Sequence, residues 1–435
     1  MIRIKLPLTF QPERQYLLEV IFSEFLGIEF TCEFTSTADY SILLENGKEL
    51  VIRDYFFSSL KGSFPALTDI PEKVDFIRIP FTTEKDLPLL YGRPEVIVEG
   101  DHILCNVDIF ASVFFMLTRW EESLIRDRDH FNRFPATSSL AFRNNFLNRP
   151  VVNEYIEFLW NLLFHLGINE KRKVSEFRIV PTHDIDVIHY RYSIGRIIND
   201  LAKKKKPSLI AKKVQYRITN PYDSFEYLMD LSERNGLTSC FYFMSGGKPE
   251  HGGCYDITGR KAGTILRKIK KRNHIIGFHP SHNAYNQPEL FLMEKNMLQG
   301  SVNSVVTEGR QHNLRFEVPD TWQIWEDCGM LIDSSMGYPE SDGFRCGTGN
   351  TFSVFNFLTR KKLGLKESPL IFMDSTFQLY RKLPVTELKP VADYYKLVSR
   401  RYNMPLTILF HNTSFEDICW KGSQTIYKDI LETGH

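Results

Sequence analysis

The sequence predicts an α/β protein built around a parallel sheet, and three observations support this. From residue 177 onward, short apolar runs alternate with segments of helical apolar spacing. Alternating strands and helices are typical of a parallel sheet, either open or closed into a barrel. Ionisable residues follow most of the apolar runs, where the strands of such a fold place their active sites. Seven strands over about 260 residues favour the barrel.

The expected strands and helices of this part alternate with some regularity. The apolar runs predict strands at 177–183, 238–244, 274–279, 307–311, 330–333, 369–373 and 405–410. Helical spacing predicts helices at 222–235, 262–272, 287–299, 319–328, 388–401 and 415–432.

The chain is long enough for two domains, since it has 435 residues and a single core rarely exceeds about 300. The basic, polar stretch at 171–173 marks the expected boundary, which gives domains 1–170 and 171–435. In the first we expect helices at 15–27, 106–122 and 151–166, and a hairpin at 39–52 around the turn Asn46-Gly47. This smaller, mixed α/β region shows no cluster of catalytic residues in its sequence.

Composition excludes several classes of protein. The chain is 43% hydrophobic and 25% charged, as in ordinary soluble proteins, and its net charge of +1 gives no general attraction for nucleic acid. Its 7 cysteines are scattered without a CxxC pair, which favours a reducing compartment. We expect a cytoplasmic protein without a transmembrane segment, because no signal peptide is recognisable and segment 151–166 contains Glu154 and Glu157.

A lysine-rich segment follows the first strand of the second domain. It contains Lys203, Lys204, Lys205 and Lys206. Charge runs are usually solvated surface. The alternative is a basic lip that attracts an anionic substrate or makes peripheral contact with a membrane.

Two carboxylates at the end of the first strand are the most informative feature. Asp184 and Asp186 are two residues apart, so they point to the same side of the strand. Unpaired, they would repel each other. A metal ion or a role as general base explains such a pair; a turn or helix cap is the structural alternative.

Later strands add further candidates at the same edge of the sheet. These residues are His279, His282, Arg310, His312, Asp333, Asp374 and His411. Aspartate and histidine are common ligands of Zn²⁺ and similar ions in catalytic sites. The set therefore predicts a metal-assisted hydrolytic site.

Six short motifs in this order resemble the NodB-like polysaccharide deacetylases, carbohydrate esterase family 4. They are HDID at 183–186, GFHPSH at 277–282, GRQH at 309–312, DSSMGY at 333–338, MDST at 373–376 and LFHN at 409–412. The resemblance covers about residues 175–435 and implies a distorted seven-stranded β/α barrel. Segments 108–112 and 118–122 are similar to a signature of the branch in which an uncharacterised N-terminal domain precedes the barrel.

The resemblance implies a metal site with one aspartate and two histidines. Asp186 and His279 match the first two ligands, but Asn283 stands where the family has its second histidine. His312 is the expected third ligand, because a side chain at a strand end points reliably to the edge of the sheet, and His282 is the alternative. The implied cofactor is one divalent ion, Zn²⁺ by preference, with Co²⁺ or Ni²⁺ as alternatives.

The resemblance also implies roles for further residues. Asp184 would be the base that takes a proton from the attacking water, with Arg310 orienting it. His411 would be the general acid for the departing amine, with Asp374 orienting it. The pocket for the acetyl group would be lined by Asp333, Ser334 and Tyr338.

The function that the resemblance implies is removal of an acetyl group from an N- or O-acetylated sugar, in surface polysaccharide or glycan metabolism. The expected partner is an acetylated sugar or glycan precursor. Two alternatives stay open. The departure at Asn283 allows a non-catalytic, glycan-binding or scaffold protein on the same barrel, and related barrels hydrolyse amides other than those of sugars.

Overall fold

The computed structural model describes residues 1–60, 64–190, 195, 198–199, 201, 207–247, 255–415 and 420–432. The lysine-rich segment 203–206, for which a surface or membrane role is predicted, lies outside the described residues. The fold is mixed α/β, as the sequence predicts, with one sheet in the N-terminal part of the chain and a larger one after residue 177.

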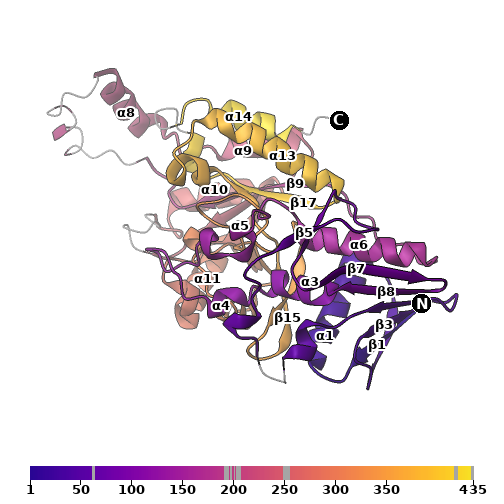
Figure 1. Ribbon diagram of the computed structural model, residues 1–435. Helices are drawn as coiled ribbons and strands as arrows, with labels where there is room; N and C mark the ends of the chain where they lie inside the picture. The colour runs from indigo at the N-terminus through magenta and orange to yellow at the C-terminus, as the bar shows by residue number, and fades with distance from the viewer. Residues whose placement is uncertain are drawn as a thin grey trace.

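The N-terminal region is built on a six-stranded mixed sheet (Figure 1). Its order is β2-β1-β3-β4-β8-β7, and a separate pair is formed by β5 and β6. The strands are β1 (Ile2–Pro7), β2 (Phe30–Thr35), β3 (Tyr40–Leu43), β4 (Glu49–Ile52), β5 (Asp75–Ile77), β6 (Leu87–Leu89), β7 (Gly92–Glu99) and β8 (His102–Val107). The hairpin β3–β4 is the one that Asn46-Gly47 predicts.

The helices of this region cover the sheet and fill the space beside it. They are α1 (Gln11–Leu18), the π-helical segment η1 (Glu19–Leu26), α2 (Phe56–Ser59), α3 (Ile109–Thr118), α4 (Glu121–Leu124), α5 (Leu140–Arg143) and α6 (Val151–His165), with short 3₁₀ turns η2 (Leu67–Asp69) and η3 (Ala136–Ser138). The helix predicted at 106–122 is shorter, because Asp108 caps α3 by accepting from the Ala111 amide at 3.0 Å and Arg119 ends it in a left-handed conformation. No helix in the described part of the chain has the length and apolar character needed to cross a lipid bilayer.

The second region is built on a nine-stranded sheet of order β14-β15-β13-β12-β11-β10-β9-β17-β16. Every ladder in it is parallel except that between β14 and β15. The strands are β9 (Arg178–Ile185), β10 (Cys240–Phe243), β11 (Ile275–Phe278), β12 (Glu308–Gly309), β13 (Ile332–Asp333), β14 (Phe352–Asn356), β15 (Lys361–Glu367), β16 (Phe372–Met373) and β17 (Pro405–Leu409).

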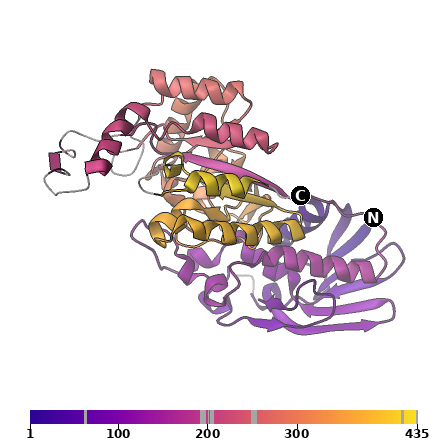
Figure 2. The same ribbon diagram turned by 90° about the horizontal axis from the view of Figure 1, so that it is seen from above.

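Helices connect these strands and cover the sheet (Figure 2). They are α8 (Pro207–Thr219), α9 (Phe225–Arg234), α10 (Arg260–Lys271), α11 (Pro288–Val302), α12 (Asp320–Asp327), α13 (Leu388–Arg401) and α14 (Ser423–Leu431), with short turns η4 (Ala284–Asn286), η5 (His312–Leu314), η6 (Thr376–Tyr380), η7 (Val385–Glu387) and η8 (Asn412–Phe415). α8 lies at the end of the molecule remote from the N-terminal sheet (Figures 1 and 2).

The seven predicted strands are confirmed, but the sheet contains two more. β14 and β15 form a hairpin whose second strand, KKLGLKE, alternates exposed and buried residues. Its lysines and glycine conceal the strand from a search for apolar runs. In the described residues the strand pairings run from β14 at one edge to β16 at the other, and these two edge strands do not pair with each other. The expected closed barrel of seven strands is therefore not confirmed.

The sheet is nevertheless strongly curved. β9 and β12 are separated by two strands, a distance of about 14 Å on a flat sheet. The Arg310 side chain, directly after β12, still reaches Asp184 on β9, with Nη1 and Oδ1 3.0 Å apart. Side chains from the carboxyl ends of distant strands therefore meet on the concave side.

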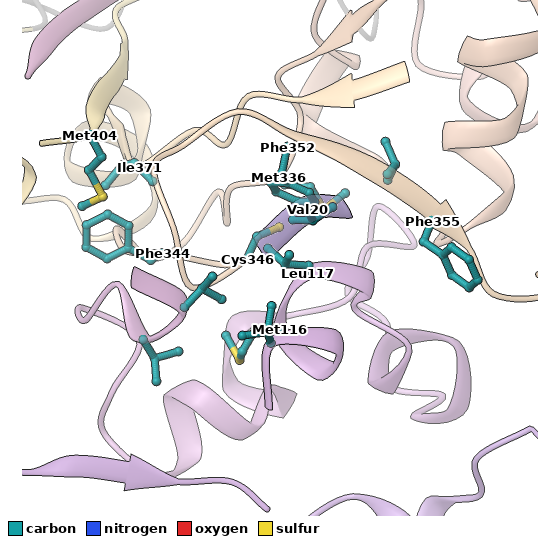
Figure 3. Packing of buried hydrophobic residues seen from close by; sticks show 14 of the residues in the cluster. Val20, Met116, Leu117, Met336, Phe344, Cys346, Phe352, Phe355, Ile371 and Met404 are labelled. Carbon is teal, nitrogen blue, oxygen red and sulfur yellow. The ribbon is translucent and has the colours of Figure 1, made fainter. Parts of the chain in front are cut away.

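The two regions share one hydrophobic core (Figure 3). Val20, Met116 and Leu117 of the N-terminal region belong to the same buried cluster as Phe352 and Cys346 of the second. These five residues are fully or almost fully buried. The hairpin β14–β15 lies on α1 and α3. Contacts made by the N-terminal region can therefore influence the second sheet directly.

Candidate metal-dependent active site

A cavity of about 160 Å³ opens where the carboxyl ends of β9, β11, β16 and β17 meet. It brings together five of the side chains that the sequence nominates. Its lining includes Asp184, Asp186, His279, His312, His411, Arg133, Asn313, Leu314, Pro339, Met373, Ser375, Gln378, Leu379, Tyr380, Leu409, Thr413 and Ser414.

Three donor atoms converge at one end of this cavity. They belong to Asp186, His279 and His312, the group in the described residues whose ligand atoms are placed to hold a metal ion. Asp186 Oδ1 lies 3.3 Å from His279 Nε2 and 3.5 Å from His312 Nδ1, and the two nitrogens are 3.0 Å apart. Donors of a tetrahedral zinc site, each about 2.0–2.2 Å from the ion, lie roughly 3.3–3.6 Å from one another. The two distances to Asp186 lie in this range, and the two imidazole nitrogens are somewhat closer to each other.

The polar environment of the three donors also fits a cation. Asp186 Oδ1 is buried and has no hydrogen-bond partner, an arrangement that is costly without a compensating charge. His279 Nδ1 lies 2.7 Å from the Arg310 carbonyl oxygen, to which it donates, so Nε2 presents its lone pair to the other two donors. Burial opposes ionisation of Asp186, but His312 and His279, when they are protonated, outweigh it and hold the pKa of that carboxyl well below its usual value.

Asp184, the predicted base, lies beside this group without belonging to it. Its Oδ1 accepts a hydrogen bond of 3.0 Å from Arg310 Nη1, and its Oδ2 is 3.8 Å from His279 Nε2. Arg310 is fully buried and also donates to the Ser334 carbonyl and to Thr182 Oγ1. The guanidinium is fixed on three sides, so it holds the Asp184 carboxylate in one orientation and compensates its charge.

His411 lies on another side of the cavity, paired with Asp374. His411 Nδ1 is 2.8 Å from Asp374 Oδ1, and Asp374 Oδ2 accepts from the His411 amide at 2.7 Å and from the Ser414 hydroxyl. Burial favours the neutral imidazole, but Asp374 outweighs it, with help from Asp186 and Asp184, and raises the pKa of His411 to about 10. The buried Asp374 carboxyl has a lowered pKa because His411 and its other donors compensate its desolvation.

His282, the alternative third ligand, is outside the donor group. Its ring lies against that of His312 at a centroid distance of 6.5 Å, and its Nδ1 is 3.3 Å from Asn313 Nδ2. The geometry places His312, rather than His282, with Asp186 and His279.

The residues expected to line an acetyl pocket do not line this cavity. Asp333, Ser334 and Tyr338 are almost fully buried behind it. Asp333 Oδ1 accepts from the Ser335 hydroxyl, Ser334 Oγ donates to the Ser368 carbonyl, and the Tyr338 hydroxyl accepts from Arg119 at 3.2 Å. The pocket prediction is corrected accordingly: the walls beside the donors come from the segments around Pro339, Met373 and Tyr380.

Arg133 is a charged lining residue that was not anticipated from sequence. Arg133 belongs to the N-terminal region, which shows no catalytic cluster of its own, yet it contributes to the cavity wall. Its sequence neighbourhood, RDRDHFNR at 126–133, resembles a solvated charged loop. Only the folded contact between the two regions places it at the site.

Comparison with known proteins separates the two regions. Residues 2–167 match the model of a family of unknown function, DUF7033. A comparison with curated proteins gives no match.

Solved structures similar to the chain are polysaccharide deacetylases and members of carbohydrate esterase family 4, the family that the motifs indicate. A probable polysaccharide deacetylase from Pseudomonas aeruginosa is 10% identical, with a TM-score of 0.38 over 61% of this chain and 89% of its own. The chitin deacetylase of the fungus Colletotrichum lindemuthianum is 10% identical, with a TM-score of 0.34 over 60% of this chain and 84% of its own. A mutant of BA3943, a pseudoenzyme of the family, is 8% identical, with a TM-score of 0.31 over 60% of this chain and 65% of its own.

Proposed function

We propose that the protein is a metal-dependent hydrolase that removes an acetyl group from an acetylated sugar. One observation carries the proposal. The buried, unpartnered Oδ1 of Asp186 and two imidazole nitrogens form a donor set in the same cavity as a carboxylate and an imidazole suited to proton transfer. Metal-assisted hydrolysis of an amide or ester needs this combination of groups.

Asp186, His279 and His312 are the residues that would hold the ion, and Zn²⁺ is the proposed one because nitrogen and carboxylate donors in this spacing suit it. When bound, a divalent ion there supplies a Lewis acid for the acyl carbonyl and makes a neighbouring water more acidic. Asn283 stands where the family has its second metal-binding histidine. His312 supplies a nitrogen in its place, so the substitution does not leave the donor set incomplete. This argues against the non-catalytic alternative.

The chain's own residues divide the proton transfers. Asp184 has Oδ2 free of the Arg310 contact, and its proposed role is to take a proton from the attacking water. Arg310 keeps the accepting carboxylate in place during that step. His411 is held protonated by Asp374 and donates a proton to the departing nitrogen or oxygen.

The size of the cavity suggests how a substrate binds. Its volume of about 160 Å³ equals roughly five water molecules at liquid density. This is room for an acetyl group and the attacking water, whereas the sugar ring would remain at the mouth. We further propose that residues 171–435 form a distorted barrel that carries the chemistry, and that residues 1–170 form a domain packed against it.

The test is acetate release from the purified chain, with and without added Zn²⁺ or Co²⁺, across N-acetylated and O-acetylated sugars and simple amides. We expect metal-stimulated release from an acetylated sugar, abolished by a chelator. Release from simple amides alone would support the non-sugar alternative. Stoichiometric metal without release from any substrate would contradict the hydrolase.

A further inference from the structure

The candidate third ligand, His312, precedes an unusual piece of backbone. Asn313 has φ 57° and ψ 16°, and Leu314 has φ 52°. The left-handed conformation is unfavourable for a residue with a Cβ, and more so for leucine than for asparagine. Two such residues in succession persist only where surrounding contacts hold them.

The N-terminal region supplies one of these contacts. Arg133 Nη1 donates to the Asn313 carbonyl oxygen at 2.8 Å and to the Tyr380 hydroxyl at 3.0 Å. Leu314 itself packs with Leu370, Met373 and Leu409. The backbone next to His312 is therefore held on one side by apolar packing and on the other by a guanidinium from a different region of the fold.

Arg133 is in turn held rigidly by its own loop. Its Nε and Nη2 lie 2.8 and 2.7 Å from Asp129 Oδ2. Asp129 Oδ1 accepts from the amides of Phe131 and Arg133, both at 2.9 Å. The guanidinium lies between two rings, 4.8 Å from the centroid of Phe131 and 5.6 Å from that of Tyr380. With 3% of its surface exposed, Arg133 has little freedom to move.

This arrangement favours a positioning role over binding of a substrate anion. The charge of Arg133 is already balanced by Asp129, and each of its three nitrogens has a partner within 3.0 Å. The contact it makes nearest to the metal donors is with backbone directly after His312. Groups that hydrogen-bond directly to a ligating side chain commonly change metal affinity 10- to 100-fold when they are removed. Arg133 bonds the backbone of the following residue, so we expect an effect at the lower end of that range.

We propose that Arg133 is a positioning residue for His312, so that the N-terminal region helps to set the metal affinity of the site in the second region. The inference rests on the proposed function only in taking Asp186, His279 and His312 as the metal site. The region matched by DUF7033 would thus have a specific role, since it completes the surroundings of the ligands without providing one.

The experiment compares Co²⁺ affinity, by competition with a chelating dye, and the visible absorption spectrum of the Co²⁺-loaded full chain. We expect Arg133→Met to bind Co²⁺ about 10-fold more weakly or worse, with an altered spectrum. Arg133→Lys should recover part of the affinity. A lysine ammonium can still reach the Asn313 carbonyl, but it cannot at the same time make the two contacts with Asp129 that the guanidinium makes. Arg126→Met, which removes an exposed arginine from the same loop, is the matched control and should behave like the parent.

Thermal unfolding without metal checks that each variant is folded. If Arg133→Met does not fold, the comparison is made with Arg133→Lys. Parent-like Co²⁺ affinity and spectrum in a folded Arg133→Met would overturn the inference, and a rise in KM alone in that variant would identify Arg133 as a substrate contact instead. A parent chain that binds no Co²⁺ would overturn the proposed function together with the inference. Metal binding in the parent with no change in the variant overturns the inference alone.

Discussion

Two buried clusters of charge in this molecule differ in one respect. At the contact between the regions, Arg119 and Arg345 enclose Glu121 and Glu122, and all four carboxylate oxygens of the glutamates accept hydrogen bonds. At the cavity, Asp186 has a buried oxygen without a donor. Both clusters lie in parts of the sequence that resemble family motifs.

The difference separates structural charge from functional charge. In the junction cluster every carboxylate oxygen has a donor within the protein, so breaking it should cost stability and leave chemistry unaffected. The cavity cluster is incomplete, so it should bind something that the protein does not contain. Buried charge by itself does not distinguish these cases, whereas the presence of an unpartnered atom beside a cavity does.

The largest expected effect is that of Asp186→Asn. The amide keeps the shape of the side chain but removes the anionic donor, so we expect bound Zn²⁺ to fall from about one per chain to near zero and metal affinity to drop more than about 100-fold. Acetate release should be lost with it. Elemental analysis after dialysis measures the metal content. Retention of stoichiometric metal would mean that Asp186 is not a ligand.

Glu122→Gln should lower stability and leave metal binding unchanged. It leaves Arg119 and Arg345 without their shared carboxylate in a buried site, where Glu122 is only 2% exposed. We expect a loss of about 3–5 kcal/mol in the free energy of unfolding. Urea unfolding measures this, and metal titration of the folded variant should match the parent. A variant of normal stability with weakened metal binding would contradict the assignment of Glu122 to a purely structural cluster.

Asp374→Asn tests the pairing of His411. Asp374 raises the pKa of His411, so the variant should have a lower one. A general acid must be protonated, and activity is lost as pH rises through its pKa. The alkaline limb of the pH–rate profile should therefore move to lower pH, with a loss of roughly 10- to 100-fold above it. An unmoved alkaline limb would show that His411 is not the acid.

The smallest effect is expected for His282→Gln. Its ring touches that of His312 but is outside the donor set, so metal affinity should change by less than about threefold, as for a surface substitution. His312→Gln is the matched comparison and should lose metal as Asp186→Asn does. If the two histidine variants exchanged these results, the ligand assignment would have to be reversed.

Local patterns nominate the candidate site, since Asp184, Asp186, His279 and His411 each lie at or just after the end of a short strand. His312 could be favoured over His282 because a strand end fixes the direction of a side chain more firmly than a loop. The sequence did not reveal the hairpin β14–β15. In its second strand, β15, lysines and a glycine occupy the exposed positions and interrupt the apolar pattern. The sequence also misplaced Tyr338, which turns toward Arg119 rather than the cavity, and missed Arg133, since both positions depend on contacts between the two regions.

The central claim is that Asp186, His279 and His312 bind a divalent ion together. Anomalous diffraction at the zinc edge from crystals grown with Zn²⁺ tests it most directly. We expect one strong peak at about 2.0–2.2 Å from Asp186 Oδ1, His279 Nε2 and His312 Nδ1. A map without a peak there, or with its strongest peak beside His282, would contradict the account.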